Sequence, residues 1–361
     1  MEIKNTYVII MAGGIGSRFW PLSTEEKPKQ FLDILNMDKS LIQITYDRVL
    51  KLVPKERIYV LTNEKYVYLV NEQLPELSNE QILTEPERKN TAPCITYAAA
   101  KIYALDSSAN LVVSPSDHLI LKEERFTEIV LKGIKNAEKG ERLTTLGIKP
   151  TRPDTGYGYI QFHQDGENVG GQIKKVKQFA EKPNREMAEI FLKSGDYYWN
   201  AGIFIWKAAT ILKAVQKFKP DLYHEFCSEF SVYNTPAEKK YVSNAFKTCE
   251  NISIDFAVLE NAKNIDVVLA DFDWSDLGTW GSLHSLLDND YKGNVVHNKK
   301  TLMIDASDNL VKLPKEKTAI IQGLENYIVV ESENRLLILN KNKEQNLKQY
   351  LNRLTEKDKL D

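Results

Sequence analysis

Residues 6–21 read TYVIIMAGGIGSRFWP, a run of aliphatic side chains that ends directly in a loop with three glycines. The run is short, and Glu2 and Lys4 precede it, so it predicts a buried strand rather than the apolar core of a signal peptide. A strand that leads into glycines lets backbone amides approach a phosphate or a nucleobase closely, because no Cβ atom stands in the way. The stretch therefore predicts an α/β fold with a ligand-binding loop after its first strand.

Two well-known glycine-loop patterns do not fit this stretch. The dinucleotide-binding pattern GxGxxG needs a third glycine where Phe19 stands, and a P-loop needs a GK[ST] tripeptide that does not follow. The glycines are followed instead by Arg18 and, after Pro21, by Lys27 and Lys29. Fixed cations beside a glycine-lined backbone suit a polyphosphate, because they neutralise its oxygens. Taken in isolation, the two lysines are also typical of a solvated surface.

The composition is that of an ordinary folded protein. A chain of 361 residues predicts about two domains, and 42% hydrophobic with 27% charged residues excludes disordered and fibrous classes. The 48 basic and 50 acidic residues leave a net charge of −2, so no global field draws the chain to nucleic acid or to an anionic membrane. An anionic ligand must therefore be held by local clusters of charge.

The cysteines and the hydropathy indicate a cytoplasmic protein. Cys94, Cys227 and Cys249 form no CxxC pair and cannot all be bridged, which favours a reducing compartment and argues against a structural zinc site. No stretch of about 18 consecutive apolar residues occurs, so no membrane span is expected.

The first half alternates β-rich runs with stretches of helical period, which predicts crossover units and a largely parallel sheet. Asn184 is expected to cap a helix and Gly195 to end it. Strands are predicted at 6–12, 57–62, 80–84 and 109–114, and helices at 40–53, 92–105, 124–139, 185–194 and 207–218.

From about residue 293 the pattern changes to short apolar runs whose starts lie about nine residues apart, which predicts a small module of stacked or meandering strands. We place a domain boundary near residue 290, between domains 1–290 and 291–361. The stretch 344–360 places its apolar residues on one helical face, which is buried either on the module or against a second subunit. The predicted strands are 301–304, 309–313, 318–321, 327–330 and 335–339.

Two aspartates are candidate metal ligands. Asp117 follows the fourth predicted strand, where open α/β sheets place their ligands, and Asp276 lies in a turn flanked by tryptophans. Two carboxylates plus substrate phosphates are a usual way to hold Mg²⁺. A turn or a helix cap explains Asp117 equally well from the local sequence, and Asp273 is open to a structural role. We expect His118 to support the site or the core rather than to act as a base.

The string AGGIGSRFWPLS at 12–23, followed by KPKQF at 27–31, resembles the signature of the sugar-phosphate nucleotidyltransferases. Trp20 and the Gln30-Phe31 pair resemble the mannose-1-phosphate guanylyltransferase branch in particular. The similarity covers most of residues 6–290 and continues more weakly beyond them. It implies a Rossmann-like, GT-A-like nucleotidyltransferase domain, followed by a small left-handed β-helix-like module with a terminal helix.

The resemblance also implies residue roles. The segment EPERKNTAP at 85–93 would hold the guanine and ribose, although Lys89 stands where the family more often has arginine. The same resemblance implies catalytic roles at the leaving group for Arg18 and Lys29; nucleotide binding by Ala12, Gly13, Gly14, Gly16, Ser17, Glu85, Asn90 and Thr91; sugar-phosphate binding by Gly158, Glu181, Lys182 and Asn200; and metal binding by Asp117 and Asp276.

Each of these segments also has a purely structural interpretation. Thr91 could cap the following helix, Gly158 could mark a β-turn or bulge, and Glu181-Lys182-Pro183 could be a solvated turn. The segment 253–260 matches the family as well, and capping by Ser253 explains much of it. These alternatives remain open at the level of sequence.

The activity that the resemblance implies is the Mg²⁺-dependent formation of GDP-mannose and diphosphate from GTP and α-D-mannose 1-phosphate. The acceptor phosphate is already an anion, so no general base or catalytic triad is required. Another sugar 1-phosphate, such as a heptose, or another nucleotide is the first alternative, and a non-catalytic sugar-nucleotide-binding regulator is the second. Many relatives continue into a phosphomannose isomerase domain; we expect no isomerase activity here. A homodimer through the C-terminal module is one of the two ways to bury the terminal helix.

Overall fold

The computed structural model describes residues 5–164 and 171–358, which form two compact units. Unit 1 comprises residues 1–13 and 42–274, and unit 2 comprises residues 14–41 and 275–361. The glycine loop therefore belongs to the same unit as the C-terminal strands. The division of the chain into domains 1–290 and 291–361 stays a prediction.

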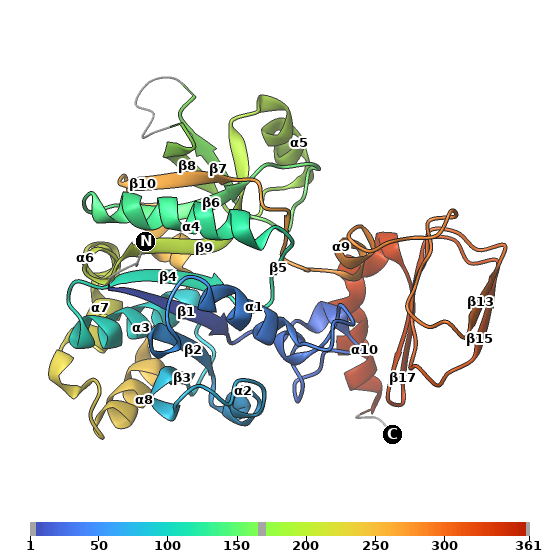
Figure 1. Cartoon of the computed structure of the whole chain (residues 1–361), viewed down its shortest axis with the longest axis horizontal. Helices are drawn as coiled ribbons and strands as arrows, with labels where there is room; N and C mark the ends of the chain where they lie inside the picture. The colour runs from blue at the N-terminus through green and yellow to red at the C-terminus, as the bar shows by residue number, and fades with distance from the viewer. Residues whose placement is uncertain (1–4, 165–170, 359–361) are drawn as a thin grey trace. The chain divides into compact units, whose positions relative to one another are not determined.

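Unit 1 contains a mixed sheet of nine strands among the described residues, in the order β3-β2-β1-β4-β9-β6-β10-β8-β7 (Figure 1). The first four strands are parallel to one another, as are β6 and β10, whereas β9, β8 and β7 run antiparallel to their neighbours. The largely parallel arrangement predicted for the first half is therefore confirmed. The strands are β1 (Thr6–Ala12), β2 (Ile58–Asn63), β3 (Ile82–Glu85), β4 (Asn110–Pro115), β6 (Leu143–Ile148), β7 (Tyr159–Phe162), β8 (Ile173–Ala180), β9 (Tyr197–Lys207) and β10 (Ile265–Ala270), with short strands β5 (Leu119–Ile120) and β11 (Trp274–Ser275) outside this sheet.

The predicted helices of this region are confirmed with shifts of a few residues at their ends. Asn184 accepts a hydrogen bond from the Met187 amide at 2.9 Å, and Gly195 ends the helix with φ of 77°, as their residue types predict. The helices are α1 (Leu41–Leu50), α2 (Val67–Gln73), α3 (Thr91–Leu105), α4 (Glu123–Glu138), α5 (Arg185–Ser194), α6 (Ala208–Phe218), α7 (Pro220–Cys227) and α8 (Glu238–Thr248), with a π-helical turn at Asp255–Leu259.

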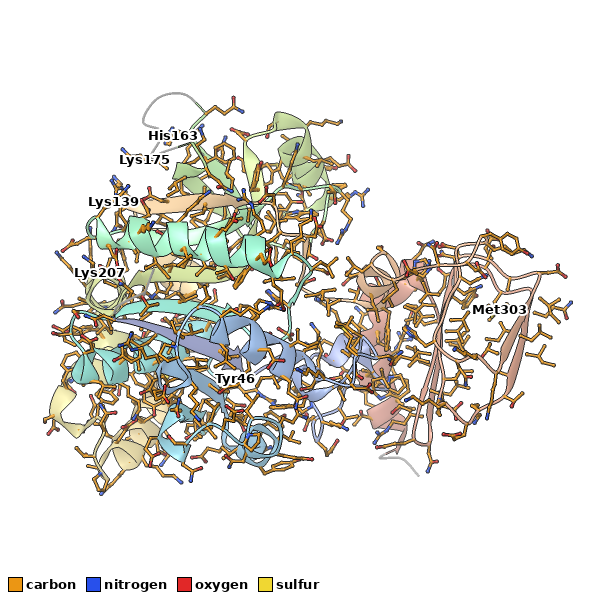
Figure 2. The ribbon with its side chains drawn as sticks, in the orientation of Figure 1. Tyr46, Lys139, His163, Lys175, Lys207 and Met303 are labelled. Carbon is orange, nitrogen blue, oxygen red and sulfur yellow. The ribbon has the colours of Figure 1, made fainter. Side chains whose placement is uncertain are left out.

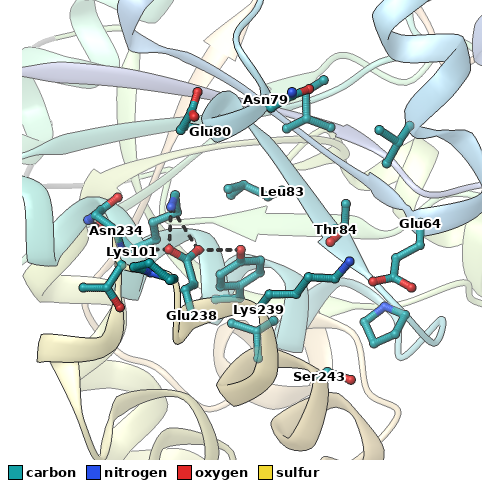
Figure 3. A pocket seen from close by; sticks show the side chains of 17 residues that line it. Glu64, Asn79, Glu80, Leu83, Thr84, Lys101, Asn234, Glu238, Lys239 and Ser243 are labelled. Carbon is teal, nitrogen blue, oxygen red and sulfur yellow. Dashed lines mark hydrogen bonds and ion pairs between the residues drawn. The ribbon is translucent and has the colours of Figure 1, made fainter.

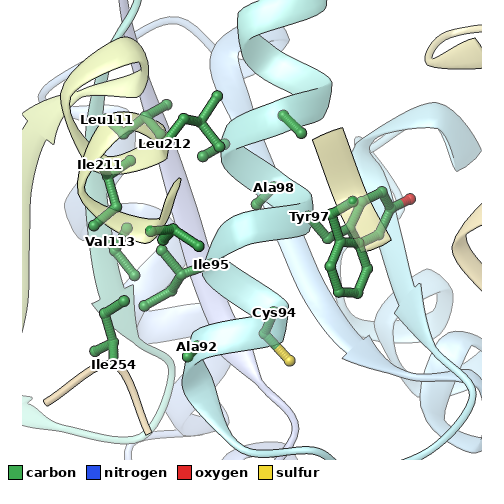
Figure 4. Packing of buried hydrophobic residues seen from close by; sticks show 14 of the residues in the cluster. Ala92, Cys94, Ile95, Tyr97, Ala98, Leu111, Val113, Ile211, Leu212 and Ile254 are labelled. Carbon is green, nitrogen blue, oxygen red and sulfur yellow. The ribbon is translucent and has the colours of Figure 1, made fainter. Parts of the chain in front are cut away.

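The main core of unit 1 lies around α3, which carries alanines at 98–100 that are almost fully buried. Figure 4 shows Ile95 of α3 beside Val113 of β4 and Ile211 of α6, three side chains of the same buried cluster. Burying an aliphatic side chain of this size contributes about 1.5–3 kcal/mol. Charged side chains such as that of Lys139 are exposed on the outside of the unit (Figure 2). The core therefore holds α3 and β4 in place, and with them the loops at their ends.

In unit 2 the short C-terminal strands form two small sheets. Strands β12, β14 and β16 pair in parallel in one sheet, β13 and β15 pair in parallel in the other, and β17 adds antiparallel to β16. From β12 to β16, successive strands alternate between the two sheets, which is the arrangement of a coiled solenoid; its left-handed sense stays a prediction. The strands are β12 (Val295–Val296), β13 (Thr301–Ile304), β14 (Leu310–Lys312), β15 (Ala319–Gln322), β16 (Tyr327–Ser332) and β17 (Arg335–Asn340).

Two buried asparagines at the same place in successive coils join them. Asn309 donates from Nδ2 to Asn294 Oδ1 at 3.0 Å and to the Leu324 carbonyl at 2.7 Å, and its Oδ1 accepts from the Tyr327 amide at 2.8 Å. Asn294 itself donates to the Ala306 carbonyl at 2.9 Å. These bonds satisfy buried backbone groups at the corners of the coils, which the apolar strand pattern alone does not do.

The terminal helix α10 (Leu347–Asp358) buries only part of its apolar face in unit 2. Leu347 is buried, whereas Tyr350 is 38% and Leu354 is 45% exposed. A short helix, α9 (Trp280–His284), precedes the strands, and its Gly281 amide donates to Glu344 at 2.8 Å. In residues 5–164 and 171–358, no helix is long and apolar enough to cross a membrane.

Candidate functional site

The glycine loop in unit 2 is held by the residues that follow it in the sequence. Gly16 adopts a left-handed conformation, with φ of 72°, before the 3₁₀ turn Ser17–Phe19. A Cβ atom on Gly16 would overlap the side chain of Lys29, so this position needs glycine for both its conformation and its contact. The Gln30 amide donates to the Gly14 carbonyl at 2.9 Å, and the Lys29 backbone amide donates to the Ile15 carbonyl at 3.0 Å. The loop and the KPKQF segment therefore form one structure.

Lys29 is buried, with only 3% of its surface exposed. Its ammonium donates to the backbone carbonyl of Asp276 at 2.7 Å and lies 5.5 Å from the centre of the Phe19 ring. The Asp276 side chain forms a tight turn with the residues that follow it, because its Oδ1 accepts a hydrogen bond from the Gly278 backbone amide at 2.8 Å. The structure thus brings together two predicted site residues that are 247 positions apart in the sequence, within unit 2. The surface interpretation of Lys29 is wrong.

Arg18 differs from Lys29 in its surroundings. It lies in the same 3₁₀ turn but is exposed, and its guanidinium has no hydrogen bond or ion pair to any residue in the described part of the chain. An extended guanidinium offers five N–H donors to an incoming anion. Lys29 is therefore fixed within the fold, while Arg18 is available to a ligand.

In unit 1, three predicted site residues lie at the carboxyl ends of parallel strands: Ala12, Glu85 and Asp117. Ala12 ends β1, Glu85 ends β3, and Asp117 comes two residues after β4, so all three lie at the carboxyl edge of the parallel strands. Gly13 lies against Glu85: a Cβ atom on Gly13 would come within 2.6 Å of Glu85 Oε1. The backbone after β1 and the Glu85 carboxylate are therefore in direct contact.

The alternative interpretation of Thr91 as the cap of α3 is wrong. Asn90 is the capping residue, and its side chain accepts from the Thr91 amide at 2.9 Å. Asn90 has φ of 67°, which asparagine tolerates better than threonine because a β-branched side chain clashes in this conformation. The Thr91 hydroxyl instead accepts from the Ile254 amide at 2.9 Å and so joins α3 to the segment before the π-helical turn.

Asp117 lies beside an ordered aromatic cluster. His118 accepts at Nδ1 from the Trp274 indole at 3.1 Å, and its Nε2 is 4.0 Å from Asp117 Oδ1. The indole contact leaves the ring proton on Nε2, facing Asp117. Asp273 forms an exposed ion pair with Lys122 at 2.8 Å. This geometry supports the expected supporting role of His118 and the structural interpretation of Asp273.

The four residues predicted to bind the sugar phosphate come together in unit 1. The Asn200 amide donates to the Gly158 carbonyl at 2.8 Å, and a Cβ atom on Gly158 would overlap the Glu181 carboxylate. Glu181 forms an ion pair with Lys182, whose side chain is 61% exposed. The segments around 158, 181 and 200 therefore form one cluster, which we call the sugar-phosphate cluster after its predicted role.

Asp255 is a member of this cluster that the sequence analysis did not single out. Its Oδ1 accepts from Asn200 Nδ2 at 2.9 Å, and Asn200 Oδ1 in turn accepts from Thr145 at 3.0 Å. Burial and the neighbouring charge of Glu181 raise the pKa of Asp255 to about 6. The only signal in the sequence was the match of segment 253–260 to the family. Ser253 does cap this turn, since its Oγ accepts from the Phe256 amide at 3.3 Å, but Asp255 faces the sugar-phosphate cluster.

Three predicted site segments each contain a residue other than glycine whose φ angle is positive, a backbone conformation that favours glycine. The φ angles are 67° at Asn90, 46° at Lys182 and 46° at Leu277, next to Asp276. Such conformations cost about 1–3 kcal/mol each and persist where the surroundings require them, which is common at binding sites. Asn36 and Glu333, outside the predicted site segments, have positive φ angles as well, so this conformation is a feature of tight turns in this protein and is not confined to the site.

Comparison with protein families decides the class. Residues 7–293 match the model of the nucleotidyl transferase family, which spans most of the chain. The chain belongs to the nucleotidyl transferase family.

Similar members and structures carry more detailed names. A mannose-1-phosphate guanylyltransferase of Salmonella montevideo is 38% identical over 98% of this chain and 74% of its own length. A crystal structure from Thermus thermophilus, described as a mannose-1-phosphate geranyltransferase, has a TM-score of 0.87 with 28% identity, over 97% of this chain and 99% of that chain. A structure from Helicobacter pylori described as a mannose-6-phosphate isomerase has a TM-score of 0.61 with 28% identity, over 75% of this chain and 99% of that chain.

Nucleotidyl transferases generally use a divalent metal, and the chemistry of the predicted donors fits one. Asp117 and Asp276 supply hard carboxylate oxygens, and both side chains are partly exposed, so each can reach a ligand. In the described part of the chain, no group of three or more His, Cys, Asp or Glu side chains is arranged to hold a metal. Hard divalent cations prefer oxygen donors of this kind, and the assignment of these two aspartates as ligands stays a prediction.

A cavity of about 840 Å³ lies along β3, the edge strand of the sheet (Figure 3). Its lining includes Thr84 and Pro86, the chain neighbours of Glu85, but none of the residues predicted to bind substrate. A buried ion pair forms part of the wall: Lys101 donates to both Glu238 oxygens at 2.9 and 2.7 Å, and the Tyr97 hydroxyl donates to Glu238 at 2.7 Å. This network satisfies its own charges, which is the condition under which burial of an ion pair is tolerated.

Gly158→Ala is expected to weaken the binding of the sugar phosphate. The added methyl group overlaps the Glu181 carboxylate and displaces it. We expect KM for the sugar 1-phosphate to rise about tenfold, because one misplaced polar contact costs about 1–3 kcal/mol. Steady-state kinetics with the sugar phosphate varied checks this. Gly140→Ala, next to the exposed Lys139, is the control, since nothing lies within 4 Å of its added Cβ; equal kinetics in the two variants would contradict the assignment.

Asp255→Asn is expected to stabilise the protein at neutral pH. The folded state has a pKa of about 6 at Asp255 against a reference of 3.8, so between these values the folded protein keeps a proton that the unfolded chain has lost. Stability therefore falls as the pH rises from about 4 to 6, and the charged carboxylate costs about 1–3 kcal/mol at pH 7. Urea unfolding should show the variant to be more stable at pH 7.5 and equal to the native protein near pH 4. If the free energy of unfolding of the variant exceeded that of the native protein by the same amount at both pH values, the titration of Asp255 would not be the cause.

Proposed function

We propose that this nucleotidyl transferase is a mannose-1-phosphate guanylyltransferase, which forms GDP-mannose and diphosphate from GTP and α-D-mannose 1-phosphate. The observation that carries the proposal is the fixed glycine loop: Gly16 packs on Lys29, and the Lys29 ammonium binds the turn of Asp276. The names of similar proteins support the choice of substrates.

The reaction needs positioning and charge stabilisation. A phosphate oxygen of mannose 1-phosphate attacks the α-phosphorus of GTP in line, and the bond from the α-phosphorus to the bridging oxygen of the diphosphate breaks. The electron pair leaves with diphosphate, and no proton has to be removed from the acceptor. Preorganised cations and amides can therefore supply the catalysis.

At the nucleotide, backbone groups of Ala12, Gly13, Gly14, Gly16 and Ser17 line the approach to the phosphates in this proposal. Arg18 and Lys29 stabilise the charge that develops on the leaving diphosphate. The exposed Arg18 does so by direct contact. Lys29 holds the loop in shape and adds its charge from within the fold.

Glu85, Asn90 and Thr91 are proposed to bind the guanine and ribose. Their contacts support this division of roles: the Glu85 carboxylate abuts Gly13, and Asn90 and Thr91 begin α3 beside it. Lys89 forms an ion pair with Glu87 at 3.2 Å, and we assign it no role.

At the sugar phosphate, Lys182 binds the phosphate monoester, while Glu181 and Asn200 orient the hydroxyl groups of mannose. The exposed ammonium of Lys182 and the chain of bonds from Thr145 through Asn200 to Asp255 support this. Gly158 contributes the backbone carbonyl that fixes Asn200.

Mg²⁺ is the metal that we propose, held by Asp117 and Asp276. When bound, such an ion withdraws charge from the phosphate oxygens and favours in-line transfer. Hard carboxylate donors and substrate phosphates are its usual partners.

The decisive experiment measures diphosphate release by the purified protein with GTP, Mg²⁺ and mannose 1-phosphate. Release with this pair alone, abolished by EDTA and absent with UTP or glucose 1-phosphate, is the expected result. A matrix of nucleotides against sugar 1-phosphates, a heptose included, would expose another substrate. Binding of GDP-mannose without turnover of any pair would replace the proposal by a regulatory role. The same preparation is assayed for fructose 6-phosphate isomerisation, which would add a second activity.

We also propose that two copies associate through unit 2. Leu302 and Ile320 pair across β13 and β15 and are 55% and 70% exposed, next to the partly exposed Ile304. Clustered exposed aliphatic side chains mark association surfaces. Light scattering should give a dimer that Ile320→Glu dissociates and that Leu105→Glu, at a 53% exposed position in unit 1, leaves intact. A native monomer would remove the proposal.

A cytoplasmic location is part of the proposal. Cys94, Cys227 and Cys249 are all free and buried, as is usual for thiols of a reducing compartment. The substrates that we propose contain no nucleic acid and no lipid.

A further inference from the structure

The Glu85 carboxylate is held from two sides in unit 1. Its Oε1 faces Gly13, where an added Cβ would lie within 2.6 Å, and its Oε2 accepts a hydrogen bond from the Cys94 thiol at 3.0 Å. The backbone of Glu85 is fixed as well, because Asn63 Nδ2 donates to its carbonyl at 2.9 Å. Glu85 is only 3% exposed, so these contacts set the direction of its carboxylate.

Cys94 differs from the other two cysteines. The Cys249 thiol bonds to a backbone carbonyl, that of Phe246, at 3.6 Å, and Cys227 lies in the apolar core. Figure 4 shows the Cys94 sulfur directed away from Ile95, Val113 and Ile211, the aliphatic side chains that α3 packs against. The thiol therefore serves a polar contact, although it belongs to a helix that is otherwise part of the core.

The protonation states suit this contact. Burial and the nearby charge of Glu85 raise the pKa of the Cys94 thiol well above its usual value, so the thiol keeps its proton and acts as a donor. Burial raises the pKa of Glu85, and the thiol hydrogen bond opposes that rise by favouring the charged carboxylate. A thiol is a weak donor to a neutral group, but an ionised acceptor strengthens the bond.

We infer that Cys94 is a positioning residue for nucleotide selection: its thiol aims the Glu85 carboxylate at the two donors, N1–H and the 2-amino group, on one edge of guanine. The inference rests on the proposed function, in which Glu85 binds the base. A carboxylate only accepts hydrogen bonds, so it matches guanine, which presents two donors there, and opposes adenine, which presents an acceptor at N1. Hypoxanthine keeps N1–H and lacks the 2-amino group, so it measures one of the two contacts.

The test compares Cys94→Ala with Cys94→Ser, which keeps a donor, and with Cys227→Ala as a control that removes a buried thiol elsewhere. Initial rates are measured with GTP and with ITP at saturating mannose 1-phosphate. Cys94→Ala should raise KM for GTP about three- to tenfold with kcat within about twofold, and should lower the preference for GTP over ITP in kcat/KM by about threefold or more. Cys94→Ser and Cys227→Ala should keep the native preference.

Two results would overturn the inference. One is a preference for GTP over ITP in Cys94→Ala equal to that of the native protein. The other is an equal loss of this preference in Cys94→Ala and Cys94→Ser. The first would show that Glu85 needs no thiol, and the second that packing rather than the donor matters. If the native protein does not turn over GTP, the proposed function fails. The inference is then decided by calorimetric titration of the same variants with GDP and IDP. The preference for GDP over IDP in binding affinity replaces the preference for GTP over ITP in kcat/KM, and the same changes between variants are expected.

Discussion

Replacing Lys29 by methionine should lower kcat by about a hundredfold or more, the usual cost of losing one preorganised charge at a leaving group. It should also lower the free energy of unfolding by about 1–3 kcal/mol, because the Asp276 carbonyl loses a buried donor. The two effects come together because Lys29 is 3% exposed and connects the glycine loop to the Asp276 turn. Rates of diphosphate release and urea unfolding of the same preparation measure both.

Arg18→Ala is the comparison that separates the two effects. Arg18 is exposed and has no hydrogen bond or ion pair within the described residues, so its loss should reduce kcat to a similar extent while stability changes by less than about 0.5 kcal/mol. Unchanged kcat in either variant would refute the corresponding role. A stability loss in Arg18→Ala as large as in Lys29→Met would show that the loop is held differently.

Asp276→Asn should reduce kcat by about two to three orders of magnitude, because the charge proposed to hold the metal is lost. The variant should still fold, since asparagine keeps an oxygen that can accept the Gly278 amide, the bond that Asp276 Oδ1 makes at 2.8 Å. The concentration of Mg²⁺ at half-maximal rate should rise by about tenfold or more. Titration of the rate with Mg²⁺ measures this directly.

Asp273→Asn is the matched control, three positions earlier in the same segment. Asp273 is 52% exposed and pairs with Lys122, which is 58% exposed; such a pair contributes about 0–1 kcal/mol. We expect activity within about twofold of the native protein and unchanged dependence on Mg²⁺. Two results would contradict the assignment of the metal to Asp276. One is native-like activity of Asp276→Asn, and the other is a loss of activity in Asp273→Asn as large as that in Asp276→Asn.

The local sequence was sufficient to predict the strands, helices and caps that depend on a few adjacent residues. The apolar run 6–12 is β1, the helical period of 185–194 is α5, and Asn184 and Gly195 cap that helix, because periodicity and capping depend on a few adjacent residues. Thr91 shows the limit of this reasoning. Its residue type suits a cap, but the left-handed conformation at the preceding residue favours asparagine there, and the threonine hydroxyl bonds to the distant Ile254 amide.

The contacts that local sequence does not reveal join distant segments. Asp255 contacts Asn200 because β9 places that asparagine beside it, and Cys94 contacts Glu85 because α3 starts next to the end of β3. Neither residue type is distinctive in its local stretch. Lys29 looked like a surface lysine in isolation, and only the fold shows that its ammonium is buried.

By itself, the sequence determined the order and type of most elements, the glycine loop after the first strand and the family to which the chain belongs. These depend on periodicity, on glycine conformations and on motifs that are continuous in the chain. Only the tertiary structure decided which carboxylates, amides and thiols meet, such as Glu85 with Cys94 and Lys29 with the Asp276 turn. The physical reason is that hydrogen bonds and charges act over a few ångströms in space, whereas the residues that make them lie up to 247 positions apart in the chain.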